Sequence, residues 1–354
     1  MRTLVATLIV AATASDIHAQ TSGMLRPPAV EAVAAVVTSS DAPGDPFLFF
    51  DVAATLPVGN HFAAIVRPYA HRLTGGVWAA EMYQLQLRYQ SATRIPVRVD
   101  GGIISSPLGL GTLELRPDLS AGIKVPFYYT SPLPRFDNRN HDVQLMSGGY
   151  PLGVVVSASG VKWDARAGVT DATPAHARNV FATERPRAMR QFVAGGGVTP
   201  VTGLRVGAGF AQGAYRLPDS SALQPGGSAG KDMAVVFNFE GEYAFGHTRL
   251  SGEWTRSRFE SMLGPAVARG FFVQAVHAFG PRLFGTVRVA SVSAPVYTGV
   301  LRERRRRSAA EVSAGYRLGH DLTVRAGYFM SRRYGASESS HMAIASLVWA
   351  RRWF

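Results

Sequence analysis

The stretch MAVVFNFEGEYAF, residues 233–245, decides the fold class because its residues alternate in character along the whole segment. Its odd positions are apolar or glycine, and its even positions include Asn238, Glu240 and Glu242. Successive side chains of a strand point to opposite faces, so one face is aromatic and apolar while the other carries ionised groups. Strands of soluble proteins seldom run this far with such a contrast. The pattern is typical of a transmembrane strand that separates lipid from water.

Similar alternation recurs from about residue 29 to the end of the chain. In the segment 161–170, Trp163 and Val169 fall on one face while Lys162 and Arg166 fall on the other. Helical spacing fits such segments poorly, because apolar residues would then recur at every third or fourth position. Further alternating segments are 83–89, 95–100 and 322–331.

The connections between these segments alternate in length. Short turn signals occur at 58–60, 92–94, 159–160, 200–203, 246–247, 280–281 and 319–320. Between them lie longer polar connections at 39–46, 106–142, 173–187, 217–231, 261–268, 295–307 and 333–340, and one tight connection at 74–76. Outer-membrane barrels have short periplasmic turns and long external loops, which is the same asymmetry.

We therefore predict an all-β protein, a transmembrane antiparallel β-barrel of about 16 strands (about 14 to 18) with both ends on the periplasmic side. The count depends on segments 30–37, 62–71 and 271–279, which alternate poorly. No linker or shift in composition indicates a second domain.

The N-terminus has the features of a secretory signal peptide. Arg2 supplies a positive end, residues 4–14 are apolar, and residues 17–19 offer a cleavage site with small Ala19. A buried first helix is the alternative. We predict a signal peptide at 1–19 and a single barrel domain at 20–354, exported to the bacterial outer membrane.

Composition excludes several classes of protein. The chain contains no cysteine, which rules out disulfides, thiolate zinc sites and cysteine nucleophiles. Its net charge of +13 raises nucleic acid as a partner, but export argues against that. The nine histidines show no metal-ligand spacing, so we expect neither a metal nor a cofactor.

The connection at 106–142 is unusually long and carries aromatic and aliphatic residues among prolines. Apolar groups in so long a segment are expected to pack, and the lumen is one place for them. Its charged residues are candidates for a constriction: Arg116, Asp118, Lys124 and Arg135.

The phase of alternation predicts which charged residues face the lumen. A charge that faces lipid near the bilayer midplane costs about 2 to 4 kcal/mol, so these groups should face water. The pore-lining candidates are Arg88, Arg98, Asp100, Lys162, Arg166, Arg205, Glu240, Glu242, Arg249, Glu253, Arg288, Arg317 and Arg325. Arginine rings favour anions, whereas arginines and carboxylates that pair across strands would form neutral ladders. The sequence is compatible with both arrangements.

Together, the alternating strands, the unequal connections, the apolar N-terminal stretch and C-terminal Phe354 resemble those of Gram-negative outer-membrane porins. The resemblance is one of pattern and covers the chain after residue 19. It implies passive diffusion of small hydrophilic solutes, contact with outer-membrane lipid, a homotrimer, and an assembly signal at Phe354 read by the barrel-insertion machinery. In that family, apolar or aromatic residues are expected at every second position back from the last residue. Ala350 and Val348 fit this expectation, but Arg352 does not.

Two other functions remain in view. A lumen filled by paired charges would make a structural or adhesion barrel with no channel. A barrel hydrolase would need a Ser/His or paired-carboxylate site, and the one matching motif, Gly226–Gly230, lies in a Gly/Ser/Pro-rich segment instead of between a strand and a helix. The basic run at 302–307 is predicted to be an external loop near acidic lipid headgroups. We expect a channel and no enzyme.

Overall fold

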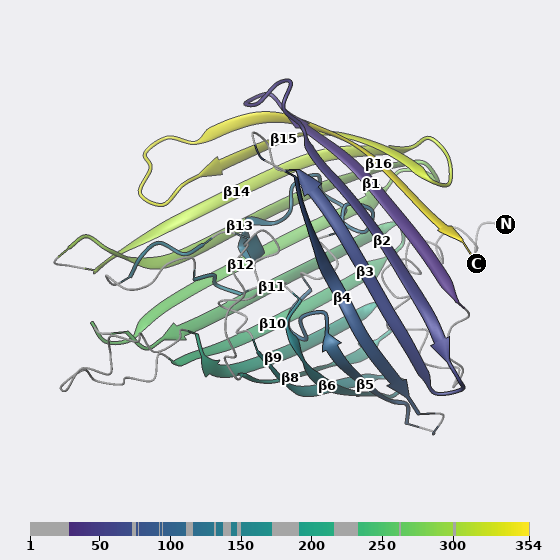
Figure 1. Cartoon of the computed structure of the whole chain (residues 1–354). Helices are drawn as coiled ribbons and strands as arrows, with labels where there is room; N and C mark the ends of the chain where they lie inside the picture. Colours follow the sequence, from purple (N-terminus) through teal and green to yellow (C-terminus); the bar gives the residue numbers. More distant parts are fainter. Residues whose placement is uncertain are drawn as a thin grey trace.

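A computed structural model describes residues 28–72, 76, 78–91, 93, 95–110, 116–130, 132–136, 143–146, 150–171, 191–215, 233–261, 263–299 and 302–353. Within them, sixteen strands close into one barrel in which each strand lies beside its neighbour in sequence and β1 pairs with β16 (Figure 1). Every pairing is antiparallel, as the Ala34↔Trp349 register of the closing pair illustrates. The predicted antiparallel barrel of about 16 strands is confirmed.

The strands differ in length but not in kind. They are β1 (Ala29–Ser39), β2 (Phe47–Val58), β3 (Phe62–Arg72), β4 (Trp78–Gln90), β5 (Val97–Ile103), β6 (Leu152–Ser159), β7 (Trp163–Thr170), β8 (Gln191–Val201), β9 (Leu204–Ala214), β10 (Met233–Phe245), β11 (Thr248–Phe259), β12 (Ala266–Ala278), β13 (Leu283–Tyr297), β14 (Arg302–Arg317), β15 (Leu322–Arg332) and β16 (Ser340–Trp353).

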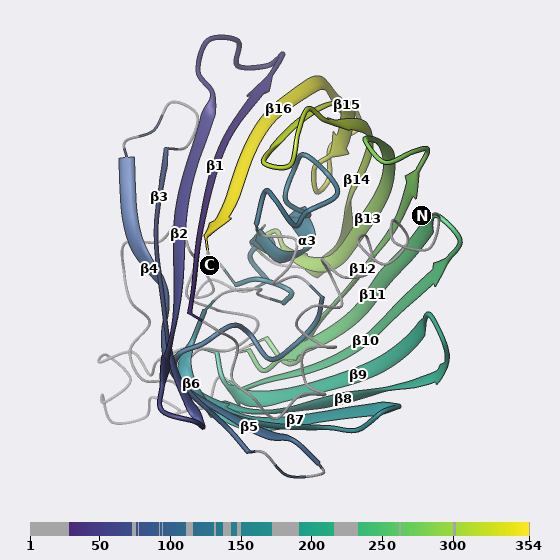
Figure 2. The same ribbon diagram turned by 90° about the vertical axis from the view of Figure 1, so that its right-hand side faces the viewer.

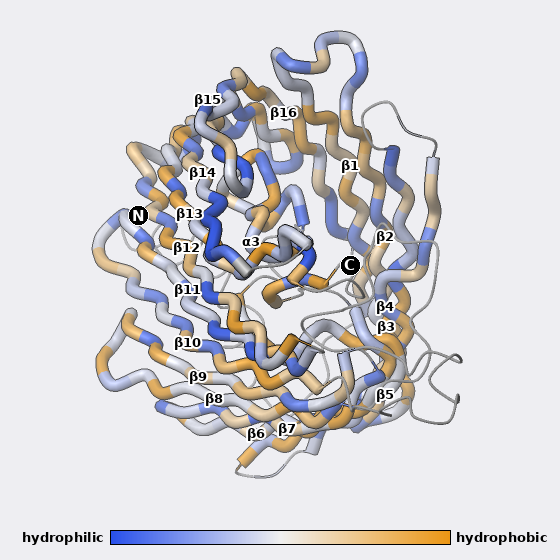
Figure 3. Tube along the Cα trace, turned by 90° about the vertical axis from the view of Figure 1, so that its left-hand side faces the viewer, coloured by the Kyte–Doolittle hydropathy of each residue, from blue (hydrophilic) through white to orange (hydrophobic). Residues whose placement is uncertain are grey.

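Alternation along β10 separates the two faces of the wall. Phe237 and Phe239 point outward and are exposed, whereas Asn238 and Glu240 point inward and are buried. The same change of character along successive residues is visible on β8–β12 in Figure 3. An outward band of exposed apolar side chains suits a hydrocarbon environment, which cannot solvate charged groups.

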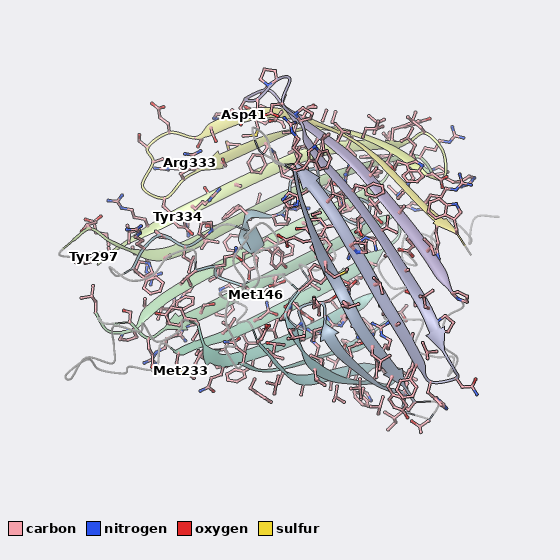
Figure 4. The ribbon with its side chains drawn as sticks, in the orientation of Figure 1. Asp41, Met146, Met233, Tyr297, Arg333 and Tyr334 are labelled. Atoms are coloured by element: carbon pink, nitrogen blue, oxygen red, sulfur yellow. The ribbon has the colours of Figure 1, made fainter. Side chains whose placement is uncertain are left out.

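Short turns gather at one end of the barrel and longer connections at the other. Gly59, Gly203 and Gly246 occupy three of the short turns with positive φ, a conformation that glycine adopts without the steric cost of a Cβ. Asp41, Tyr297, Arg333 and Tyr334 mark the other end, at the top and left of Figure 4.

One predicted connection is wrong. The segment 295–307 was expected to be an external loop, but β13 runs to Tyr297 and β14 begins at Arg302, so the basic run belongs to a strand. Its side chains alternate: Arg307 reaches the ring of Phe127 inside the barrel, while Arg304 bonds the backbone of Val267 on the outside. Arginine on both faces hides the apolar alternation on which the prediction relied.

The connection between β5 and β6 lies inside the barrel and not outside it. Figure 2 shows it within the ring of strands, together with the short helix α3 (Phe127–Thr130). Among the described residues, no helix is both long and apolar enough to cross a membrane. The inward path of this connection divides the lumen wall into a covered part and an open part.

Candidate functional site

The inner connection packs mainly against β9–β15, and Val155 of β6 and Val193 of β8 belong to the same buried cluster. Tyr128, Phe136 and Met146 are fully buried there, and Met146 lies in the interior in Figure 4. They meet small or aromatic inward residues of the strands, so the two surfaces can approach closely. The buried cluster comprises Ile104, Leu108, Phe127, Tyr128, Tyr129, Leu133, Phe136, Val143, Leu145, Met146, Val155, Val193, Ala211, Tyr215, Ala234, Val236, Phe259, Ala266, Ala268, Phe272, Ala290, Val292 and Ala294.

Glu253 on β11 ties this connection to the wall. Its carboxylate accepts hydrogen bonds from the Tyr129 hydroxyl, from the backbone N–H of Leu110 at 2.9 Å and from Nδ2 of Asn238 at 2.7 Å. Burying a carboxylate is costly unless donors surround it, and here three donors do so. Glu253 therefore holds the connection in place and does not face a solute path.

Arg325 and Arg288 fasten the next part of the connection, residues 116–125. Arg325 donates to the carbonyl oxygens of Pro117, Ser120 and Gly122 at 2.9, 2.7 and 2.9 Å. Arg288 donates to the carbonyl oxygen of Lys124 at 2.7 Å. Charged donors make stronger hydrogen bonds than neutral ones, so these guanidinium groups act as clamps.

Gly122 leaves room for that clamp. A Cβ at Gly122 would lie 2.6 Å from Nη2 of Arg288, closer than two such atoms can approach without a shift. Glu311 completes the arrangement by accepting from the N–H of Ile123 at 2.5 Å, with Arg288 3.8 Å away.

The constriction candidates are also on this connection. Arg116 pairs with Asp118 at 2.7 Å and with Glu31 of β1 at 3.4 Å, which links the connection to the closing strand. The N–H of Lys124 is directed at Glu311 at 3.4 Å, and the carbonyl of Arg135 accepts from the N–H of Tyr297 at 2.7 Å. The structure thus places Arg116, Asp118 and Lys124 inside the barrel and exposed Arg135 near its outer end.

The wall formed by β4–β9 carries a different arrangement of charges. Asp100 on β5 lies between Arg88 and Arg98, at 2.7 and 2.9 Å. Gln86 adds a hydrogen bond of 3.1 Å to the same carboxylate. One carboxylate is therefore shared by two guanidinium groups, which leaves this group of three charges positive.

A second ionic cluster lies farther along the same wall. Arg205 on β9 bridges Asp164 of β7 at 3.0 Å and Glu240 of β10 at 2.7 Å. Arg166 lies 3.3 Å from Glu240 and 3.8 Å from Asp164. Two arginines and two carboxylates balance here, so the excess positive charge of these two clusters comes from the Arg88–Arg98 pair.

Exposure decides which of these charges a solute would meet. The side chains of Arg88, Arg98 and Arg166 are 27%, 28% and 21% exposed, whereas Asp100 and Glu240 are 8% and 1% exposed. Asp100 and Glu240 lie against the wall, whereas the side chain of Asp164 is 26% exposed. The accessible surface is therefore more positive than the formal count of charges.

Two glycines of β8, Gly195 and Gly197, form the surface on which Arg166 and Arg205 lie. A Cβ at Gly197 would lie 2.7 Å from Nη2 of Arg205, and one at Gly195 would lie 3.3 Å from Nε of Arg166. Because glycine has no side chain, the guanidinium groups lie flat on β8 and the lumen stays wider on this side.

Comparison with solved structures gives the fold its context. The chain is similar to the loop L8 deletion mutant of OmpT, an outer membrane protein of Vibrio cholerae, with a TM-score of 0.59 and 12% identity over 93% of this chain and 100% of that one. It is similar to the anion-selective porin from Comamonas acidovorans, with a TM-score of 0.57 and 12% identity over 92% and 98% of the two chains. The fold is that of an outer-membrane porin. Salmonella typhi OmpF in its complex with daunomycin gives a TM-score of 0.59 at 9% identity, covering 93% and 98%.

At these identities the likeness shows the porin fold alone. No family model and no curated protein matches the sequence. Site assignments in this porin fold therefore rest on the geometry of the chain itself.

Other predicted pore residues lie toward the short-turn end of the porin fold. Lys162 lies in the turn between β6 and β7 and is exposed. Arg317 ends β14 and donates to the carbonyl of Pro281 at 3.1 Å. Arg249 and Glu242, on β11 and β10, are half-buried on the inward face.

The last strand gives a second correction. Val348 pairs with Ala35 and is buried, whereas Leu347 is exposed on the outside, so the apolar phase assigned to Ala350 and Val348 faces the lumen and not lipid. Three further predictions fall outside the described residues: the signal peptide at 1–19, the motif at Gly226–Gly230 and the assembly signal at Phe354.

Sequence reasoning missed one buried ionic group of the porin fold. Arg67 on β3 pairs with Asp51 on β2, donates to the Tyr150 hydroxyl at 3.1 Å and lies 4.8 Å from the ring centre of Tyr83. An arginine flanked by Val66 and Pro68 on a poorly alternating strand was the available signal. Among the described residues, no cluster of three His, Cys, Asp or Glu could hold a metal ion.

Proposed function

We propose that the protein is a passive diffusion channel for small hydrophilic solutes across the bacterial outer membrane, with a preference for anions. Solutes would pass along the wall formed by β4–β9, opposite the wall that the inner connection covers. Transport of this kind works by size and charge and involves no bond chemistry.

The observation that carries the proposal is the exposure of Arg88 and Arg98 beside the buried carboxylate of Asp100. Side chains inside a filled barrel would be buried like those of a protein core. Partly exposed guanidinium groups on a lumen-facing wall instead indicate contact with water, and accessible arginines favour anions.

The direct test is single-channel recording of the purified full-length protein in a planar bilayer. We expect discrete current steps, and a reversal potential in a salt gradient that shows anions to be more permeant than cations. A protein that inserts and folds but carries no current would contradict the channel. Current with cation preference would contradict the anion preference alone.

A second candidate is a structural barrel with a filled lumen. It is favoured by the large buried cluster around Tyr128 and Phe136 and by the clamps at Arg288 and Arg325. Proteoliposomes separate the two: a channel lets small sugars enter and the vesicles swell, whereas a filled barrel does not.

Two further proposals concern assembly and export. One structural neighbour, in-vitro folded OmpT of Vibrio cholerae, is named as a trimer form, which supports a homotrimer for this chain. Mass photometry of the detergent-solubilised protein should give three times the chain mass. We also propose that residues 1–19 direct export and are removed, so N-terminal sequencing of membrane-derived protein should begin at Gln20.

A further inference from the structure

The outward face of β11–β14 carries a row of arginines that the channel proposal does not use. Arg256 on β11 lies directly opposite Arg269 on β12. Arg269 lies opposite Ser293 on β13, which in turn lies opposite Arg306 on β14. We call Arg256, Arg269 and Arg306 the arginine row. It crosses four neighbouring strands, which lie side by side in Figure 1.

All three arginines of the row are exposed. Within the part of the chain that the structure describes, none of them forms an ion pair or a hydrogen bond. The outward strand positions of β11–β14 carry no carboxylate among these residues. Like charges directly opposite each other on a sheet repel and destabilise it, so the row lacks the counter-charge that its geometry calls for.

Neighbouring outward arginines extend the positive surface. Arg258 follows on β11, opposite Val267, and Arg304 follows on β14, opposite Pro295. Arg304 donates to the carbonyl of Val267 at 3.0 Å, so its guanidinium group lies flat over the outside of the sheet. The surface therefore has five cationic groups, on β11, β12 and β14.

The depth of the row identifies the medium it meets. Trp254 and Phe271 form the outward pair two residues closer to the middle of the barrel, and both are exposed. Two residues of a strand span about 7 Å, so the row lies just beyond an aromatic and apolar surface. That is the level of lipid headgroups, on the side of the longer connections.

Other parts of the same end differ. On β1–β10, the outward strand arginine among the described residues is Arg72, and it is paired with Asp45 at 3.0 Å. Its charge is already compensated within the chain. The unpaired surface is thus confined to one side of the barrel.

We propose that the arginine row binds a phosphate-bearing lipid of the outer leaflet. Guanidinium groups match phosphate with paired hydrogen bonds, and neighbouring rows of arginine fit a headgroup that carries two phosphates. The acyl chains would lie on the apolar surface at Trp254 and Phe271. This binding is independent of whether the lumen conducts.

The test is titration of the full-length protein in detergent with a diphosphorylated glycolipid, followed by native mass spectrometry. We call the triple variant Arg256→Gln/Arg269→Gln/Arg306→Gln the rung variant. It removes all three charges of the arginine row. The control Lys162→Gln/Arg282→Gln/Arg351→Gln removes three exposed charges from the short-turn end. Each arginine near an anionic membrane surface contributes about fivefold to binding, so we expect the rung variant to bind on the order of 100-fold more weakly.

The control should bind the glycolipid as the parent protein does, and the same glycolipid without its phosphates should bind poorly to both. Equal affinity of the rung variant and the parent would overturn the proposal, as would equal binding of the dephosphorylated lipid. Displacement of the lipid by inorganic phosphate at the same concentration would also overturn it, because the surface would then recognise the free ion. Circular dichroism of both variants confirms that the barrel is folded.

Discussion

The walls formed by β4–β9 and by β11–β14 both direct arginines and carboxylates into the lumen, yet they serve different ends. On β4–β9, Arg88 and Arg98 share Asp100 and remain in contact with solvent. On β11–β14, Arg288 and Glu253 are buried because the inner connection lies over them and takes up their hydrogen bonds. A charge that faces the lumen therefore lines a path only where nothing covers it.

The size of the neighbouring inward residues accounts for the difference. Gly195 and Gly197 on β8 leave a shallow floor on which arginines lie flat. On β11–β12, inward Phe259 and Phe272 offer aromatic surface to Phe136, Tyr128 and Tyr129. Burial of aromatic rings is strongly favourable, so the connection packs where such rings are present.

The largest expected effect on stability comes from removing the hydrogen bonds that hold the inner connection against the barrel wall. Replacing Arg325 with Met removes hydrogen bonds to three carbonyl oxygens of the connection. We expect a loss of about 3 to 5 kcal/mol in the free energy of unfolding, because buried acceptors lose a charged donor. Urea unfolding in micelles, followed by tryptophan fluorescence, measures it.

Arg351→Met is the matched control. Arg351 is exposed at the short-turn end and lies 3.9 Å from the carboxylate of Asp321. Its removal should change stability by less than about 0.5 kcal/mol. Equal effects of the two substitutions would mean that Arg325 does not clamp the connection.

A smaller effect on stability is expected when a side chain is added at Gly197, beneath Arg205. In Gly197→Val the new side chain would displace the guanidinium group of Arg205 toward the lumen. Overpacking of this kind costs about 1 to 3 kcal/mol, and the displaced group should lower single-channel conductance. Gly241→Val is the control, since a Cβ there would meet only the carbonyl of Arg205 at 3.8 Å. A conductance unchanged in Gly197→Val, or lowered equally in both, would show that this floor does not border the path.

The smallest expected change is a shift of selectivity without loss of the pore. Arg88→Gln/Arg98→Gln leaves Asp100 uncompensated, so the reversal potential in a salt gradient should move toward cation preference. Arg256→Gln/Arg269→Gln removes two charges from the outside of the barrel and should leave the reversal potential where it was. A shift of the reversal potential in the second variant alone would contradict the proposal that solutes pass along the β4–β9 wall.

Much of the fold could be predicted from the sequence, because the bilayer imposes alternation on each strand. The segment 233–245 shows this directly, since its aromatic residues face outward and its carboxylates inward. β14 was partly missed because Arg304 and Arg306 face outward beyond the apolar band, where lipid imposes no such pattern.

Less of the candidate site was predictable. The phase of one strand indicates that Arg205 and Glu240 face inward, but their pairing depends on the register between β9 and β10, which a single strand does not encode. The aromatic residues of 106–142 predicted that this connection packs. Which wall it covers depends on inward residues more than a hundred positions away, such as Phe259 and Phe272.

One matched pair of substitutions tests the proposed solute path directly, because the chain has no cysteine of its own. Ser157 on β6 lies between Arg98 and Arg166 on the β4–β9 wall, whereas Ser257 on β11 is fully buried and donates to the carbonyl of Leu145 at 2.7 Å. Ser157→Cys and Ser257→Cys place the same thiol on each wall. A charged, water-soluble thiol reagent should label the first quickly and reduce its single-channel current, and should leave the second unchanged. Labelling of Ser257→Cys with loss of current, and none at Ser157→Cys, would contradict the proposed path.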